Sequence, residues 1–131
     1  MFLDASAIIA ILARESEGMA LAKRLDQASK VRTSAIVVFE AAIGLARTGN
    51  MPIAEAAAIL DDFLEEVGAE IVPVTAAIGQ DAIDAFGRFG MGRHPAKLNM
   101  GDCFAYACAR SFDMPLLYKG GDFPRTDIEA A

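Results

Sequence analysis

The feature of this sequence that most constrains its fold is the alternation of short apolar runs with longer helical stretches. Strand-like runs occur near residues 1–4, 31–34, 71–74 and 115–118. The stretches between them have helical composition or spacing, and they cover residues 5–13, 15–28, 35–47, 52–67, 75–86 and 101–111. Strands separated in this way form parallel pairs joined by helical crossovers. The sequence therefore predicts an α/β fold, with a mostly parallel sheet and helices on both faces.

Length and composition predict a single domain over residues 1–131. One hydrophobic core closes at about 100–150 residues, and 54% of the residues are hydrophobic. Charged residues interrupt every apolar run well short of the ~20 residues that span a bilayer. No basic region of a signal peptide precedes Asp4. We therefore expect a cytoplasmic protein without membrane contact, in which Cys103 and Cys108 are reduced and buried.

The charge balance and the scarcity of soft ligands limit the possible partners and metals. A net charge of −6 argues against nucleic-acid binding through a global positive field, although a local basic patch remains possible. His94 is the single histidine, and the two cysteines do not have the spacing of a zinc site. Any bound metal is therefore expected to have oxygen ligands.

Two acidic residues are expected at the carboxyl ends of strands, where ligands bind in open α/β sheets. Asp4 ends the first predicted strand, and Asp122 follows the last one through Gly120 and Gly121. Each also has a structural explanation. Asp4 can cap the helix that follows it, and Asp122 beside glycine is ordinary turn chemistry.

Two further acids belong to apolar helices. Glu40 lies in a stretch that is apolar on nearly all sides, which is typical of a buried helix. A buried carboxylate costs several kcal/mol unless a partner or a metal compensates, and an arginine at a sheet edge could be that partner. Asp102 begins another apolar helix, three residues after Asn99, so these two residues could instead form a capping box.

Four acids at the carboxyl rim or on a buried helix face would repel each other unless a cation lay among them. A divalent ion resolves this repulsion. Ligation by oxygen alone points to Mg²⁺, or to Mn²⁺.

The motifs that carry these acids resemble those of PIN-domain ribonucleases, in particular VapC-type toxins of bacterial toxin–antitoxin systems. The resemblance covers essentially the whole chain, and its most specific segment is Leu98 to Ala107. The matching segments are Phe2-Leu3-Asp4-Ala5-Ser6-Ala7, Thr33-Ser34-Ala35 leading to Glu40, Leu98-Asn99-Met100-Gly101-Asp102-Cys103-Phe104-Ala105-Tyr106-Ala107, and Leu116-Leu117-Tyr118-Lys119-Gly120-Gly121-Asp122-Phe123 with Thr126-Asp127-Ile128.

The resemblance implies a PIN-like three-layer fold, with about five mostly parallel strands flanked by helices. It implies that Asp4, Glu40, Asp102 and Asp122 form an acidic cluster that binds Mg²⁺ and is catalytic. Ser6 is then a polar neighbour of Asp4, and Asn99 supports Asp102 through the cap. Family members commonly carry an asparagine before the last acid, where this chain has glycine. The resemblance also implies a cognate antitoxin as protein partner and a homodimer.

The function implied is a metal-dependent endoribonuclease toxin that hydrolyses phosphodiester bonds in RNA. From residue 85 to residue 101 the sequence contains no acid, but it contains Arg88, Arg93 and Lys97. We expect these three side chains to hold the RNA backbone beside the metal. The alternative is an ordinary connection whose charges are solvated.

Other functions remain open at this stage. The chain could be a catalytically idle module of the same fold that only binds, or a metal nuclease directed at DNA. A receiver-like signalling domain would need a pair of acids after the first strand, which Leu3-Asp4-Ala5 does not supply. A metal-free ribonuclease would need a paired acid and base, usually two histidines.

Overall fold

The computed structural model describes all residues from Met1 to Ala131. Its strands are β1 (Phe2–Leu3), β2 (Arg32–Ser34), β3 (Glu70–Val72) and β4 (Leu116–Leu117). Its helices are α1 (Ala5–Leu12), α2 (Gly18–Leu25), α3 (Ala35–Gly49), α4 (Ile53–Glu66), α5 (Ala76–Phe89) and α6 (Met100–Ser111), followed by a short 3-10 helix, η1 (Phe123–Arg125).

The four strands form one parallel sheet in the order β3-β2-β1-β4. This arrangement confirms the predicted α/β fold. The expected number of about five strands differs from the four observed. Ala130 forms a single parallel bridge with Leu116, so the chain beyond β4 contributes one residue pair there instead of a full strand.

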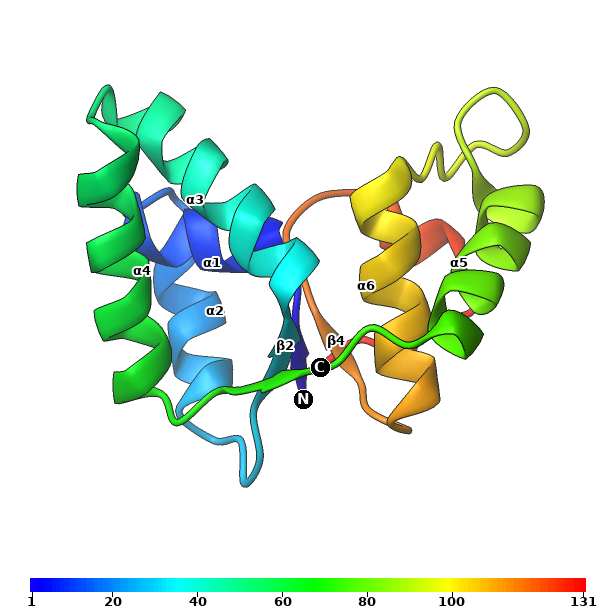
Figure 1. Ribbon diagram of the computed structural model, residues 1–131, viewed down its shortest axis with the longest axis horizontal. Coiled ribbons are helices and arrows are strands. Elements are labelled where there is room, and N and C mark those ends of the chain that lie inside the picture. Colours follow the sequence, from blue (N-terminus) through cyan, green and yellow to red (C-terminus); the bar gives the residue numbers. More distant parts are fainter.

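Helices cover both faces of the sheet, which gives three layers (Figure 1). Helices α1 to α4 lie on one side of the strands, and α5 and α6 lie on the other. The residues of β1 and β4 are at most 1% exposed, so this part of the sheet lies in the middle of the core. Helix α6 buries several small residues, among them Ala105, and small side chains allow close packing on the sheet.

The helix ends follow the local sequence. The Ser34 hydroxyl accepts a hydrogen bond from the Val37 amide (3.4 Å) and caps α3. Asn50 ends the same helix with φ of 48°, a left-handed conformation that asparagine adopts more readily than most residues. Thr75 caps α5 by accepting from the Ile78 amide.

One predicted boundary is wrong in a way that affects function. Helix α5 continues to Phe89, whereas the sequence predicts a loop from Gly87 onward. Glycine lowers helix propensity, but the buried Ala85 and Phe89 hold the last turn of α5 in the core. The connection to α6 is therefore shorter than predicted, and Arg88 lies on a helix.

Two further findings concern the cysteines and the length of the apolar helices. Cys103 and Cys108 are both buried and unpaired, as the sequence predicts. No helix is long and apolar enough to cross a membrane.

Candidate metal centre

Asp4 is the most deeply buried of the four acids, with 3% of its surface exposed. It directly follows β1 and caps α1, and its Oδ2 accepts hydrogen bonds from the amide (2.9 Å) and the hydroxyl of Ser6. Burial raises the pKa of Asp4, and the hydrogen bonds from Ser6 counter this effect only in part. Asp4 therefore does cap α1, and the cap directs its carboxyl group toward the rim of the sheet.

Ser6 connects the first strand to the segment that follows the last one. Its hydroxyl donates to Asp4 and accepts from the backbone amide of Lys119, at 2.9 Å. The Lys119 side chain forms ion pairs with Glu15 and Glu17, which precede α2. These contacts fix the start of the loop that carries Asp122.

Glu40 reaches the rim from the middle of α3 and is half-buried. Burial, together with the smaller effects of the charges on Asp4 and Asp102, raises the pKa of Glu40 to about 7. None of the ion pairs in the structure involves Glu40, so an arginine partner does not explain its position.

Asp102 and Asn99 form the capping box that the sequence suggests. The Asn99 Oδ1 accepts from the Asp102 amide and the Asp102 Oδ2 accepts from the Asn99 amide, both at 2.9 Å. Burial is the main cause that raises the pKa of Asp102 to about 6; the hydrogen bond with Asn99 opposes the shift, and the charges of Asp4 and Asp122 contribute to it.

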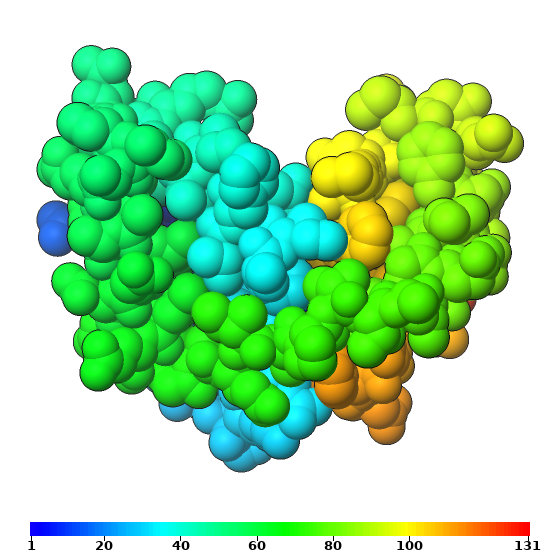
Figure 2. Space-filling model, in the orientation of Figure 1, coloured from blue at the N-terminus to red at the C-terminus, as the bar shows by residue number.

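Three of the four acids line one pocket of about 310 Å³ at the carboxyl edge of the sheet. Figure 2 shows the molecule hollowed between α3 and the first turn of α6. The polar residues that line the pocket are Asp4, Ser6, Glu40, Arg47, Asn99 and Asp102. Asp122 is exposed in the loop before η1 and is not part of the lining, although its charge reaches Asp102.

The carboxyl groups share this pocket without forming a closed ligand set. No three His, Cys, Asp or Glu side chains are arranged as metal ligands. Like charges keep carboxylates apart, and the Oδ2 atoms of Asp4 and Asp102 are held by Ser6 and Asn99. A cation would have to draw the groups together.

Arg47 is a pocket residue that sequence reasoning missed. It lies in the last turn of α3, seven residues after Glu40, and helical periodicity places such residues on one face. It brings a positive charge to the pocket that Asp4, Glu40 and Asp102 also line.

The three basic residues predicted to bind RNA have different environments. The guanidinium of Arg88 is paired with Asp127 (2.7 Å), whose other oxygen accepts from the Tyr106 hydroxyl at 2.5 Å. Arg93 and Lys97 lie on the exposed loop between α5 and α6. The structure thus gives Arg88 a structural partner, contrary to the prediction that all three side chains extend from one loop.

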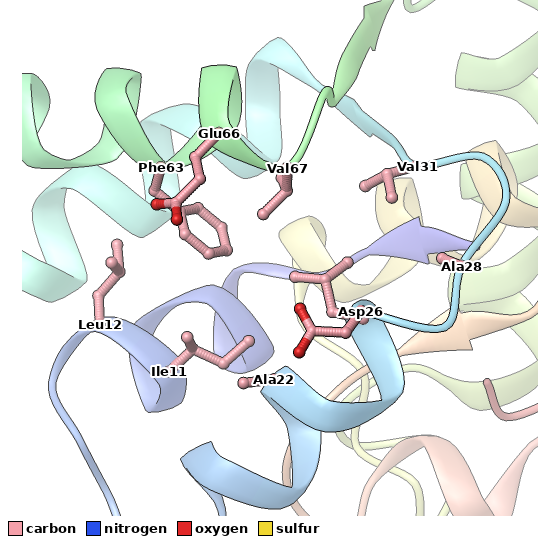
Figure 3. A pocket seen from close by; sticks show the side chains of 10 residues that line it. Ile11, Leu12, Ala22, Asp26, Ala28, Val31, Phe63, Glu66 and Val67 are labelled. Carbon is pink, nitrogen blue, oxygen red and sulfur yellow. The ribbon is translucent and has the colours of Figure 1, made fainter.

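A second, apolar pocket of about 550 Å³ lies between α1, α2 and α4. Figure 3 shows Ile11 and Leu12 of α1 facing Phe63 and Val67 across it, with the carboxylates of Asp26 and Glu66 at its edge. None of the four acids of the metal centre lines this pocket.

Comparison with known proteins agrees with this geometry. The model of the PIN domain family matches residues 1–129. A VapC ribonuclease of Rhizobium meliloti is 40% identical, over 97% of this chain and 98% of that protein. Ribonuclease VapC28 of Mycobacterium tuberculosis is 41% identical, over 100% of this chain and 97% of that protein.

A solved structure has the same fold. The crystal structure of Mycobacterium tuberculosis VapC20, described as a sarcin-ricin loop cleaving toxin, superposes with a TM-score of 0.77. The two sequences are 21% identical, and the match covers 99% of this chain and 97% of VapC20. The family model, the two full-length relatives and the shared fold agree, and the chain belongs to the PIN domain family, among the VapC ribonucleases.

Proposed function

We propose that this chain is a Mg²⁺-dependent endoribonuclease toxin in which Asp4, Glu40, Asp102 and Asp122 form the metal centre. One observation carries the proposal: carboxyl groups from the end of β1, from α3 and from α6 line one pocket of a VapC ribonuclease, where burial and neighbouring acids raise the pKa of Glu40 and of Asp102. Perturbed carboxyl groups in a cleft are typical of functional sites.

The donor set suits a hard divalent cation. The pocket offers carboxylate, hydroxyl and amide oxygens and lacks histidine and cysteine, which is the chemistry that Mg²⁺ and Mn²⁺ prefer. Asp102 uses Oδ2 for its cap, so its Oδ1 is left for a ligand. Asp122 lies on a loop and could approach the other acids without rearrangement of the core.

The residues divide the work of phosphodiester hydrolysis. A bound divalent cation favours ionisation of the attacking water and offsets charge that develops on the phosphate. Asp4 is oriented by Ser6, and Asp102 by its cap, so both carboxyl groups are positioned before substrate arrives. Arg47 supplies a positive charge at the rim that can bind the RNA phosphate.

Cleavage of RNA tests the proposal. Purified protein without antitoxin is incubated with total cellular RNA and Mg²⁺, beside an EDTA control and the variant Asp4→Asn. Discrete fragments are expected only from the wild type with metal, because the variant removes a buried ligand charge, and antitoxin should suppress them. Folded protein that leaves RNA intact in Mg²⁺ and Mn²⁺ contradicts the proposal. Cleavage of DNA but not of RNA would instead support a DNA-directed nuclease. RNA binding without cleavage would support a catalytically idle module.

Metal affinity should depend on pH through Glu40 and Asp102. The metal-free pKa of Glu40 is about 7 and that of Asp102 about 6, and only the ionised forms bind a cation. Calorimetric titration with Mn²⁺ is expected to show affinity rising, with proton release, as the pH increases from about 5.5 to about 8. Constant affinity over that range would contradict the shared site.

The same raised pKa values also affect the stability of the metal-free protein, which should fall as the pH rises. A carboxyl group with a raised pKa binds more protons in the folded state, so its contribution to stability is lost as the pH rises through the folded value. For Glu40 this window extends from its ordinary pKa of 4.5 to about 7. Urea denaturation in EDTA should show this decline, and Glu40→Gln should reduce it.

We also propose that Arg93 and Lys97, without Arg88, contact the RNA backbone. Arg93 and Lys97 are exposed on the loop that leads into α6, whereas Arg88 is paired with Asp127. In an inactive Asp4→Asn background, the double change Arg93→Ala and Lys97→Ala should weaken RNA binding and lower its salt slope, by about 0.7 per lost phosphate contact. The change Lys23→Ala on the exposed surface of α2 is the matched control. An unchanged salt dependence of RNA binding would contradict a contact between RNA and the loop that carries Arg93 and Lys97.

Two protein partners complete the proposal. A cognate antitoxin is proposed to place an apolar helix in the pocket of Figure 3, with basic side chains near Asp26 and Glu66. A homodimer is proposed to cover the exposed apolar side chains Ile83, Phe86 and Met100, which border an apolar hollow on α5 and α6. Light scattering on the free protein would distinguish a dimer from a monomer.

A further inference from the structure

Gly101 is a glycine that neither its backbone nor its helix requires. It is the second residue of α6, and it is not among the glycines with positive φ. Glycine is among the poorest helix formers, and alanine is the best. A different reason must therefore explain a buried glycine in the first turn of this helix.

The space beside Gly101 is taken by the carboxyl group of Glu40. A Cβ atom built at residue 101 would overlap both carboxylate oxygens and the Cδ of Glu40. At the other glycines, an added Cβ would meet backbone, an apolar side chain or open space. Gly101 is thus the one glycine whose missing side chain makes room for a charge.

Glu40 also lacks the anchors that hold the other two pocket acids. Asp4 is fixed by Ser6 and Asp102 by Asn99. No hydrogen bond contributes to the electrostatics of Glu40, which is affected only by burial and by two like charges. Its position between α3 and the first turn of α6 therefore depends on the shape of that turn.

We infer that Gly101 is a positioning residue for Glu40. Because residue 101 has no side chain, the Glu40 carboxyl group occupies the space beside it, which we call the seat, and there approaches Asp102. The inference rests on the proposed metal centre. The positive end of the α6 dipole lies at this turn and partly offsets the repulsion between the acids. A side chain at residue 101 would push the carboxyl group out of the seat.

The substitution Gly101→Ala separates this role from a structural one. The obstacle to the new Cβ is the free end of a flexible side chain, so the helix can keep its place while Glu40 moves. We expect Mn²⁺ affinity, measured by calorimetry, to fall by about tenfold or more, as for other residues that orient metal ligands. The melting temperature in EDTA should be unchanged or higher, because alanine favours the helix.

Two further variants complete the test. Gly79→Ala places the same change in α5, where a Cβ meets nothing, and it should leave Mn²⁺ affinity unchanged. In a Glu40→Asp background, whose side chain is one methylene shorter, Gly101→Ala should weaken Mn²⁺ binding by a smaller factor than in the wild type.

The possible outcomes are distinct. Wild-type protein that binds no Mn²⁺ contradicts the proposed metal centre itself. If the wild type binds Mn²⁺ and the Mn²⁺ affinity of Gly101→Ala is within about twofold of the wild-type value, the proposed metal centre is supported and the positioning role of Gly101 is contradicted. A lower melting temperature in EDTA, or an equal loss of affinity in the Glu40→Asp background, would mean that the glycine serves packing, and would also overturn the inference.

Discussion

The repulsion between carboxyl groups at the carboxyl edge of the sheet is the interaction on which the rest of the site depends. Asp4 and Asp102 each raise the pKa of Glu40, and Asp4 and Asp122 raise that of Asp102. Burial is the larger cause of both pKa shifts, because ionised groups lose their hydration there, and the repulsion adds to it. A fold that places charges in this way sacrifices stability at the rim, and a divalent cation is the partner that would restore it.

The architecture keeps these charges in place despite their repulsion. Parallel pairing brings the ends of β1 and β4 together, and α3 and α6 approach the same edge from opposite faces of the sheet. The strands themselves carry fully buried residues, such as Leu3 of β1 and Leu117 of β4. Local hydrogen bonds then orient individual carboxyl groups, through Ser6 for Asp4 and through Asn99 for Asp102. Strain at the site is thus supported by a well-packed core.

Much of this arrangement could be predicted from the sequence because its signals are local. The strand positions, the capping box of Asn99 and Asp102 and the burial of the two cysteines depend on neighbouring residues or on periodicity. The alternatives considered for Asp4 and Asp102 were structural roles, and Asp4 does cap α1 while Asp102 completes the capping box of Asn99. Such roles are compatible with the proposed metal centre, because the cap at the end of β1 also aims the Asp4 side chain at the rim.

The features that could not be predicted depend on contacts between distant segments. Arg88 pairs with Asp127, 39 positions along the chain, and no local pattern reveals that partner. The packing of Phe89 extends α5 past Gly87, which outweighs the local propensity. The close approach of Glu40 to Gly101 brings together two residues that are 61 positions apart on different helices, so it becomes visible only in three dimensions. Arg47 differs, since its helical spacing from Glu40 could have placed it in the pocket.

Anomalous diffraction from crystals grown with Mn²⁺ would locate the cation on which this interpretation depends. An anomalous peak is expected in the pocket between Asp4, Glu40 and Asp102, with Asp122 moved toward it and the Glu40 carboxyl group still against Gly101. A saturating concentration of Mn²⁺ that leaves this pocket without a peak, or gives one only elsewhere on the surface, would contradict a metal centre formed by these acids.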